Sequence, residues 1–163
     1  MANLSHTTEH NKSAADSRLR SLVGYNMKRA YHEIQNELTQ SLKPIDLKIG
    51  SFAVLMSIVD CPGLKQSALA ETLAIEQANL VQLIDDLEKK ALIKRERVST
   101  DRRAYALFAT NAGQRRCQQV EATCRSLEAD FLHGFSEQDI AMLIDLMQKI
   151  ELRIKTKRGN DHD

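Results

Sequence analysis

The stretch from Lys89 to Arg103 concentrates positive charge in a chain that is otherwise nearly neutral. The whole chain has 23 Lys and Arg against 22 Asp and Glu, whereas this stretch has seven basic residues against two acidic ones, a local excess of five. The basic residues are Lys89, Lys90, Lys94, Arg95, Arg97, Arg102 and Arg103. Because Lys and Arg that neutralise phosphates release counterions, such a patch supplies most of the non-specific affinity for nucleic acid. The stretch therefore predicts a phosphate-binding surface.

Enzyme chemistry finds little support in the residues. The chain has no GxSxG, HExxH or GxxxxGK[ST] motif, and no carboxylates or Cys/His group with catalytic spacing. It has no CxxC, and His6, His10 and His162 lie in polar terminal segments, so no zinc site is predicted. We expect a protein that is not an enzyme and that needs no cofactor or metal.

The three cysteines, Cys61, Cys117 and Cys124, leave two interpretations open. An odd number without paired spacing argues against a disulfide framework and suits a reducing compartment. They are then either buried, inert thiols or oxidant-sensing thiols. No apolar run approaches the roughly 20 residues of a membrane span, and the first residues lack the layout of a signal peptide. A cytoplasmic protein without membrane contact is expected.

Two short helices joined by a tight turn should position the basic stretch. Apolar and polar residues alternate with helical period over 66–73 and again over 77–91. In the second segment Leu80, Leu83, Ile84 and Leu87 form an inward face. The residues left outward are Gln77, Ala78, Val81, Gln82, Asp85 and Glu88. This pattern is typical of a helix-turn-helix whose second helix enters a DNA groove.

Longer helices and a hairpin surround this pair. Helical periodicity is also present over 19–38, 47–59, 112–132 and 137–155, with Pro44 ending the first helix and Ser136 capping the last. Residues 92–97 and 104–109 read as two short strands around the polar tip 98–103. We therefore predict a mainly α fold with a small β-hairpin wing: a winged helix-turn-helix with long terminal helices.

Three segments of the sequence resemble the MarR family of transcriptional regulators. Residues 101–113, Asp-Arg-Arg-Ala-Tyr-Ala-Leu-Phe-Ala-Thr-Asn-Ala-Gly, are similar to its wing signature, D-x-R followed by a strand Leu and T-x-x-G. Residues 87–95 resemble its L-E-x-K-G-L-I-x-R segment, and residues 62–70 its entry to the helix-turn-helix. The agreement in layout extends over about residues 18–155.

The resemblance implies DNA-binding roles for particular residues. The Arg matching Arg103 reaches the minor groove or nearby phosphates and the Asp matching Asp101 orients it, which suits the negative potential of a narrow groove. Arg102, Arg97 and Lys94 would contact the sugar-phosphate backbone of the DNA. At the helix-turn-helix, the expected contacts are Gln66, Ser67, Gln77, Asn79 and Gln82, although Asn79 would equally suit a local cap. The amides can pair with adenine.

The sequence also departs from the family pattern. Ala91 replaces the usual Gly after the second helix of the pair, so an altered left-handed turn is expected there. Gln82 and Asp86 stand where the family often has Arg, which leaves this helix uncharged to acidic. Because this helix lacks positive charge, the alternative of an adaptor protein that has the winged fold but does not bind DNA stays open.

The last helix predicts a second copy of the chain. Its apolar stripe, Ile140, Leu143, Ile144, Met147, Ile150 and Ile154, needs a partner surface, which its own domain or a second subunit could supply. Family members pair their terminal helices in a homodimer, which sets two recognition helices one DNA turn apart on a palindrome. We expect a disordered tail over 1–16, dimerisation helices over 17–44 and 112–158, and the winged helix-turn-helix over 45–111.

A small-molecule effector is the remaining expectation. Family members commonly bind an aromatic ligand between the first, second and fifth helices and then release DNA. Here Tyr25, Arg29 and His32 flank the first helix, and Phe52 and Met56 on the second would face them, offering rings, a cation and an imidazole to an aromatic acid or its CoA thioester. These residues would equally fit the edge of the core. The expected function is a repressor released from a palindromic operator by such an effector, with an oxidant-sensing regulator as the alternative.

Overall fold

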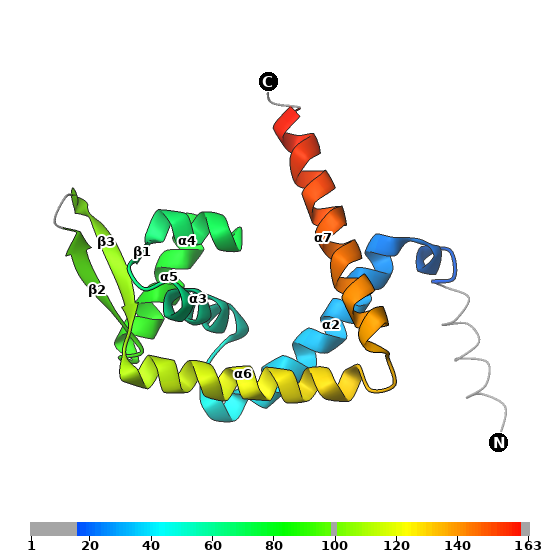
Figure 1. The fold of residues 1–163 in the computed structure, drawn as a ribbon, viewed down its shortest axis with the longest axis horizontal. Coiled ribbons are helices and arrows are strands. Elements are labelled where there is room, and N and C mark those ends of the chain that lie inside the picture. Colours follow the sequence, from blue (N-terminus) through cyan, green and yellow to red (C-terminus); the bar gives the residue numbers. More distant parts are fainter. Residues whose placement is uncertain (1–15, 99–100, 161–163) are drawn as a thin grey trace, which may run out of the picture. The chain divides into compact units, whose positions relative to one another are not determined.

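The computed structural model describes residues 16–98 and 101–160, and the side chains of residues 98, 101–104 and 159–160 lie outside what it describes. The chain divides into two compact units, Met1–Thr123 and Cys124–Asp163, and each is treated by itself. The described residues of the first unit form two 3-10 turns, five helices or parts of helices and three strands (Figure 1). They are η1 (Leu19–Ser21), α2 (Val23–Leu42), η2 (Lys43–Ile45), α3 (Ile49–Asp60), β1 (Leu64–Lys65), α4 (Gln66–Leu73), α5 (Gln77–Lys89), β2 (Ile93–Val98), β3 (Asp101–Ala109) and the first part of α6 (Asn111–Phe131).

The predicted mainly helical architecture with one hairpin is confirmed, and most helix bounds agree to within two or three residues. The first helix differs at its start. Leu19–Ser21 form a 3-10 turn, and α2 begins only at Val23, because Leu22 is extended. The Asn26 amide fixes this break by donating to the carbonyls of Arg20 and Leu22, at 2.7 and 2.9 Å. At its other end α2 stops at Leu42, but Lys43 before Pro44 keeps helical angles (φ −52°, ψ −47°), and a 3-10 turn continues over Lys43–Ile45. The expectation that Pro44 forces the preceding residue out of the helical region was therefore wrong.

The sheet has three antiparallel strands in the order β1-β3-β2. Strand β1 was not predicted: it pairs Leu64 with Leu107 and Lys65 with Ala106. Gly63 makes this pairing possible, because its φ of 87° lies in the left-handed region that favours glycine. Its N–H donates to the Leu107 carbonyl at 2.8 Å. The sheet is thereby tied to the chain immediately before α4.

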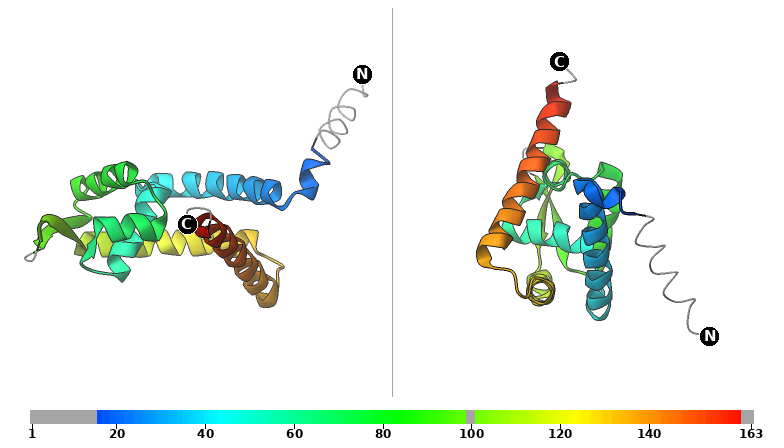
Figure 2. Two further views of the ribbon diagram at one scale, coloured as in Figure 1. Left: turned by 90° about the horizontal axis from the view of Figure 1, so that it is seen from above. Right: turned by 90° about the vertical axis from the view of Figure 1, so that its right-hand side faces the viewer.

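The hairpin of β2 and β3 projects from helices α3 to α5, as Figures 1 and 2 show. Its register pairs Ile93 with Ala109 and Arg97 with Tyr105, and it shifts between Arg97 and Val98. Strand β3 begins at Asp101, so the backbone is paired further toward the tip than the predicted loop over 98–103. The polar residues of this segment predicted a loop, but they do not reveal that Asp101 pairs with Val98 of the neighbouring strand.

The core of the first unit lies where α3, α4 and α5 meet the sheet. Its fully buried side chains are Val54, Leu55, Ile58, Leu69, Leu80, Ile84, Leu87, Leu107 and Val120, each 0% exposed. Burial of this apolar surface is the main term that holds the helix-turn-helix against the hairpin. The core therefore fixes the position of α5 relative to the wing.

The start of α6 packs against the chain that leaves α5. The Thr110 hydroxyl donates to the carbonyls of Ala91 and Leu92, at 2.8 and 3.2 Å, and accepts the N–H of Gly113 at 3.0 Å. A Cβ on Gly113 would lie 2.0 Å from the Leu92 carbonyl oxygen. The T-x-x-G pattern thus has a physical basis: Thr110 caps the helix, and Gly113 allows its close approach.

The second unit contains the end of α6 and helix α7 (Glu137–Asn160). Ser136 caps α7 as predicted: its hydroxyl accepts the N–H of Asp139, and the Asp139 carboxylate accepts the N–H of Ser136, both at 3.1 Å. The side-chain and backbone hydrogen bonds from Ser136 lower the pKa of Asp139. Of the predicted apolar stripe, Ile140 is half-buried, and the other members are exposed by 37 to 50%.

Candidate nucleic-acid interface

Helices α4 and α5 form the expected helix-turn-helix. They are separated by Ala74, Ile75 and Glu76, and Ala74 takes the left-handed conformation with φ of 50°. The turn is closed by the N–H of Ile75, which donates to the Ala70 carbonyl at 3.0 Å. Neither helix has a side-chain hydrogen bond at its N-cap, which is Lys65 for α4 and Glu76 for α5. Their first N–H groups are thus left for an anion such as a phosphate.

Helix α5 divides into the two faces that its sequence predicts. Leu80, Ile84 and Leu87 are fully buried, and Leu83 is half-buried. The exposed residues are Gln77, Ala78, Asn79, Val81, Gln82, Asp86 and Lys89. The inward apolar face and the uncharged outer face near the N-terminal end are both confirmed.

Asp85 and Glu88 depart from the expectation of an outward acidic face. Both are half-buried and pair with Arg95 of β2: its guanidinium donates to Glu88 at 2.6 Å and makes a shorter contact with Asp85. The Arg95 side chain is only 22% exposed. Arg95 was counted among the cations available to phosphate, and that count was wrong, because the residue neutralises two carboxylates of α5. The same pairing leaves the outer face of α5 less acidic than its sequence suggests.

Other cations of the basic stretch also have protein partners. Lys90 donates to the Asp46 backbone carbonyl at 2.6 Å and to the Asp46 carboxylate at 2.8 Å. The bond to the carboxylate is the first cause of the lowered pKa of Asp46. Lys94 pairs with Glu96 at 2.6 Å and lies over the Phe108 ring, at 5.7 Å from its centroid. Arg97 is exposed and has no ion-pair partner among the described residues. Three cations of the basic stretch, Lys90, Lys94 and Arg95, are thus paired with carboxylates of the protein, so fewer are left for phosphate than the sequence count implies.

Ala91 keeps the left-handed turn that was expected to be altered. Its φ is 54°, the N–H of Ala91 donates to the Glu88 carbonyl at 2.8 Å, and the N–H of Leu92 donates to the Leu87 carbonyl at 2.9 Å. These two bonds form a Schellman motif. Leu92 is 4% exposed, so burial of its side chain helps to hold Ala91 in a conformation that disfavours a Cβ.

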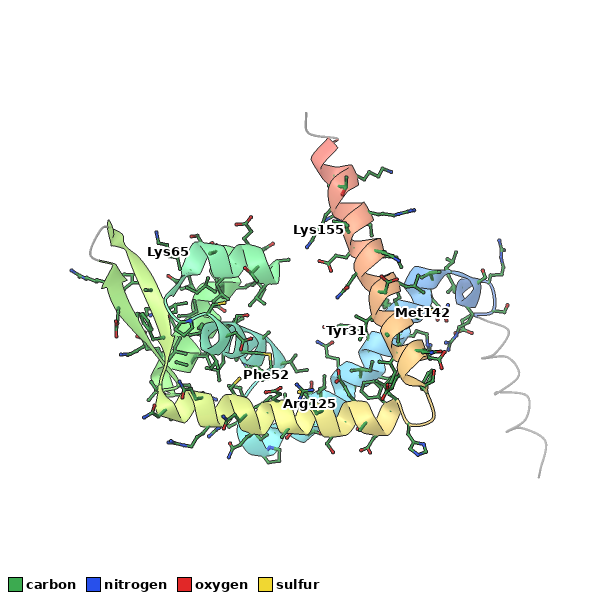
Figure 3. All side chains as sticks on the ribbon, viewed as in Figure 1. Tyr31, Phe52, Lys65, Arg125, Met142 and Lys155 are labelled. Carbon is green, nitrogen blue, oxygen red and sulfur yellow. The ribbon has the colours of Figure 1, made fainter. Side chains whose placement is uncertain are left out.

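The predicted DNA-contacting side chains lie on the helix-turn-helix and on β2. Ser67, Gln77, Asn79, Gln82, Lys94 and Arg97 are exposed, whereas Gln66 is half-buried. Gln66 and Ser67 occupy the first turn of α4, next to exposed Lys65, which Figure 3 labels at the start of that helix. The side chains of Asp101, Arg102 and Arg103 lie outside the described residues. The described part of the candidate interface therefore consists of the outer face of the helix-turn-helix and strand β2, both in the first unit.

Comparisons with known proteins agree with this geometry. A model of the MarR family matches residues 47–105, which hold α3, the helix-turn-helix and most of the hairpin. The structure of a transcriptional repressor, CouR, bound to a 23-mer DNA duplex is 26% identical, covers 83% of this chain and 96% of its own, and superposes with a TM-score of 0.79. Residues 47–105 of this chain are therefore a MarR-family region. This region has the winged helix-turn-helix that DNA-binding transcriptional regulators of the family share.

Two further MarR-family structures share the fold at lower identity. CouR from Rhodococcus jostii RHA1 bound to p-coumaroyl-CoA is 22% identical, with a TM-score of 0.74 over 81% of this chain and 93% of its own. The PcaV regulator from Streptomyces coelicolor in complex with its natural ligand is 20% identical, with a TM-score of 0.75 over 82% of this chain and 94% of its own.

The residues predicted to hold an effector lie on α2 and α3. Tyr25 and Arg29 come together on Asp16: the Tyr25 hydroxyl donates to its carboxylate at 3.1 Å, and Arg29 lies 3.8 Å from it. Desolvation raises the pKa of Asp16, but hydrogen bonds from Arg20 and Tyr25 and the charges of Arg20 and Arg29 outweigh it, so the pKa is lowered. His32 contacts Asn36 at 3.3 Å. Phe52 and Met56 are half-buried on α3, and Figure 3 labels Phe52 there.

A cavity of about 480 Å³ lies elsewhere in the first unit, at the end of α2 and the start of α3. Leu42 and Leu47 form part of its wall, and its charged lining consists of Lys43, Lys48 and the ion pair of Lys90 with Asp46. None of the five predicted effector residues lines it. Its lining was not predicted, because Lys90 reaches it from α5, more than 40 residues away in the sequence.

The cysteines differ in their exposure. Cys117 is buried, and burial, with Glu121 and Asp60 as further causes, raises the pKa of its thiol. Cys61 is exposed at the end of α3. Within residues 16–98 and 101–160, no cluster of three or more His, Cys, Asp or Glu suits a metal ion. No helix in those ranges is both long and apolar enough to cross a bilayer.

Proposed function

We propose that this protein is a ligand-responsive repressor of the MarR family that binds a palindromic operator as a homodimer and leaves it when a small aromatic effector binds. The observation that carries the proposal is the exposed, uncapped helix-turn-helix beside the hairpin, in a chain that is 26% identical to a repressor bound to DNA. Pairing of Asp85 and Glu88 with Arg95 also weakens the case for an adaptor without DNA binding, since that case rested on an acidic recognition helix.

The homodimer is supported by exposed apolar side chains near both ends of the chain. On α7, Leu143, Ile144 and Ile154 are about half exposed, and on α2 Val23 and Tyr31 are more exposed still. Apolar surface of this extent is typical of an interface with another protein. In the proposal, residues 17–44 and 112–158 form the dimer and residues 45–111 bind DNA. Sedimentation equilibrium of the full chain should give twice the monomer mass of 18.4 kDa, and a monomer at micromolar concentration would contradict the proposal.

The operator can be found without knowledge of the genome. The full chain is used to select duplexes from a random DNA pool, and enriched sequences are compared. A dimer with two-fold symmetry should enrich an inverted repeat whose half-sites are about ten base pairs apart. Enrichment of a single asymmetric half-site, or no enrichment, would contradict the proposed mode of binding.

The effector is proposed to be a phenolic acid or its CoA thioester. Support comes from the CouR structure bound to p-coumaroyl-CoA and from the ring, cation and imidazole that Tyr25, Arg29 and His32 place along α2. A thermal-shift screen of p-coumarate, 4-hydroxybenzoate and their CoA thioesters tests this, because a ligand of the folded state raises its apparent stability. A compound that stabilises the protein should also release it from the selected operator. Failure of every compound would end the aromatic-effector part of the proposal alone.

A further inference from the structure

We propose that Val81 is a specificity-determining residue, whose side chain contacts the C5 methyl group of a thymine in the major groove. The inference deepens the proposed operator binding and rests on it. Val81 is the only one of the five Leu, Ile and Val residues between Gln77 and Lys89 whose side chain is well exposed. It is 39% exposed, whereas Leu80, Ile84 and Leu87 are fully buried. No described contact of the fold explains a branched apolar side chain at this position.

The position of Arg95 shows which part of the helix can reach bases. Arg95 extends from β2 to Asp85 and Glu88, and so occupies the C-terminal half of the outer face of α5. The N-terminal half, with Gln77, Ala78, Val81 and Gln82, stays exposed. A recognition helix contacts base edges with residues near its N-terminal end. Val81 therefore lies within the part of α5 that is open to a DNA groove.

The composition of this exposed half favours A·T base pairs. It presents the side-chain amides of Gln77 and Gln82 and the methyl groups of Ala78 and Val81, and α5 has no Lys or Arg before Lys89. In the major groove, guanine is read chiefly by Arg or Lys, adenine by Asn or Gln, and the thymine methyl by apolar side chains. Amides and methyl groups together match an adenine beside a thymine. Val81 supplies the larger apolar contact.

The experiment removes the C5 methyl group of one thymine in each half-site of the DNA and, separately, the methyl groups of Val81 in the protein. Duplexes selected with the full chain are resynthesised with deoxyuridine for thymidine at each conserved thymine, one symmetric pair of positions at a time. Binding of the wild type and of Val81→Ala is measured by fluorescence anisotropy. Burial of one methyl-sized group changes affinity about fourfold, so replacement in both half-sites should weaken wild-type binding about 15-fold at one position.

Val81→Ala should bind the thymidine duplex more weakly and lose most of that discrimination. Since Val81 is exposed, the variant should keep the wild-type circular dichroism spectrum. The matched control is Asp86→Ala, which changes an exposed residue on the other flank of α5, where Asp86 lines a small cleft with Leu47 and Lys48. Its overall affinity is expected to rise as a negative charge is removed, while its preference for thymidine over deoxyuridine stays as in the wild type.

Three outcomes would overturn the inference. The first is equal wild-type affinity for the thymidine and deoxyuridine duplexes at every position. The second is a discrimination that Val81→Ala retains in full, which would assign the methyl contact to another side chain. In both cases the operator proposal stands, because the duplexes still bind. If no duplex is enriched in the selection, the operator proposal and the Val81 inference fail together.

Discussion

Gly113→Ala is expected to destabilise the winged helix strongly, although alanine is the better helix former. The added Cβ would lie 2.0 Å from the carbonyl oxygen and 2.9 Å from the carbonyl carbon of Leu92. Non-bonded contacts below about 3 Å are strongly repulsive, so the start of α6 must move away by about 1 Å. That movement separates Thr110 from the carbonyls of Ala91 and Leu92, which it now bonds at 2.8 to 3.2 Å.

The magnitude follows from three contributions. Overpacking costs about 1–3 kcal/mol, and each weakened hydrogen bond costs about 0.5–1.5 kcal/mol. Replacing glycine by alanine within a helix returns about 1 kcal/mol. With two hydrogen bonds weakened, we therefore expect Gly113→Ala to lower the free energy of unfolding by about 1–5 kcal/mol, against the 5–15 kcal/mol typical of a domain.

Urea unfolding followed by far-UV circular dichroism measures this change, with all proteins at one concentration because a dimer's stability depends on it. Gly24→Ala is the matched control: it makes the same chemical change within α2, where a new Cβ meets nothing within 4 Å. The control should be neutral or stabilised by up to about 1 kcal/mol. If Gly113→Ala unfolds at the same urea concentration as the control, the close contact with Leu92 is refuted.

Three further changes follow from the same structure. Ala91→Gly should raise the free energy of unfolding by about 0.5–1 kcal/mol in the same urea assay, because glycine adopts the left-handed φ of 54° without a Cβ clash; a loss of stability would contradict this reason. Arg95→Gln should lower the free energy of unfolding by only about 1 kcal/mol, since its partners are more than a third exposed and screened by water. It should also weaken operator binding, because two carboxylates are left unpaired on α5; unchanged affinity would show that they do not face DNA. In the native protein at pH 7.5, iodoacetamide followed by peptide mass spectrometry should modify exposed Cys61 well before Cys117, whose thiol is buried and has a raised pKa; faster modification of Cys117 would revive an oxidant-sensing role for it.

Local patterns in the sequence were sufficient for the helices of the DNA-binding region. Helix α4 has the predicted bounds, Gln66–Leu73, and α5 begins at the predicted Gln77. Both could be predicted because each helix buries one face, and that face has apolar residues at helical spacing. Leu80 and Ile84 were correctly assigned to the inside. The cap of α7 by Ser136 was also predicted, since a capping box is contained within four successive residues.

Contacts between distant segments could not be predicted in the same way. Strand β1 consists of two residues and depends on Leu107, more than 40 positions away. The charge count misjudged Arg95 because its partners, Asp85 and Glu88, lie on a helix while Arg95 lies on a strand. A signal was present, since two carboxylates three residues apart share one helix flank. The turn at Ala91 was misjudged because the buried Leu92 and its hydrogen bond to Leu87 outweigh the local preference for glycine.

Binding of the selected palindrome by the wild type and by Arg103→Ala, across a series of salt concentrations, tests the central claim most directly. For the wild type, the logarithm of the binding constant should fall linearly as the logarithm of the salt concentration rises. Arg103→Ala should bind at least about tenfold more weakly, with a slope smaller by about one for each phosphate contact removed. Arg115→Ala, an exposed arginine on α6, should match the wild type. A folded Arg103→Ala that binds with wild-type affinity and salt dependence would contradict DNA binding through the wing.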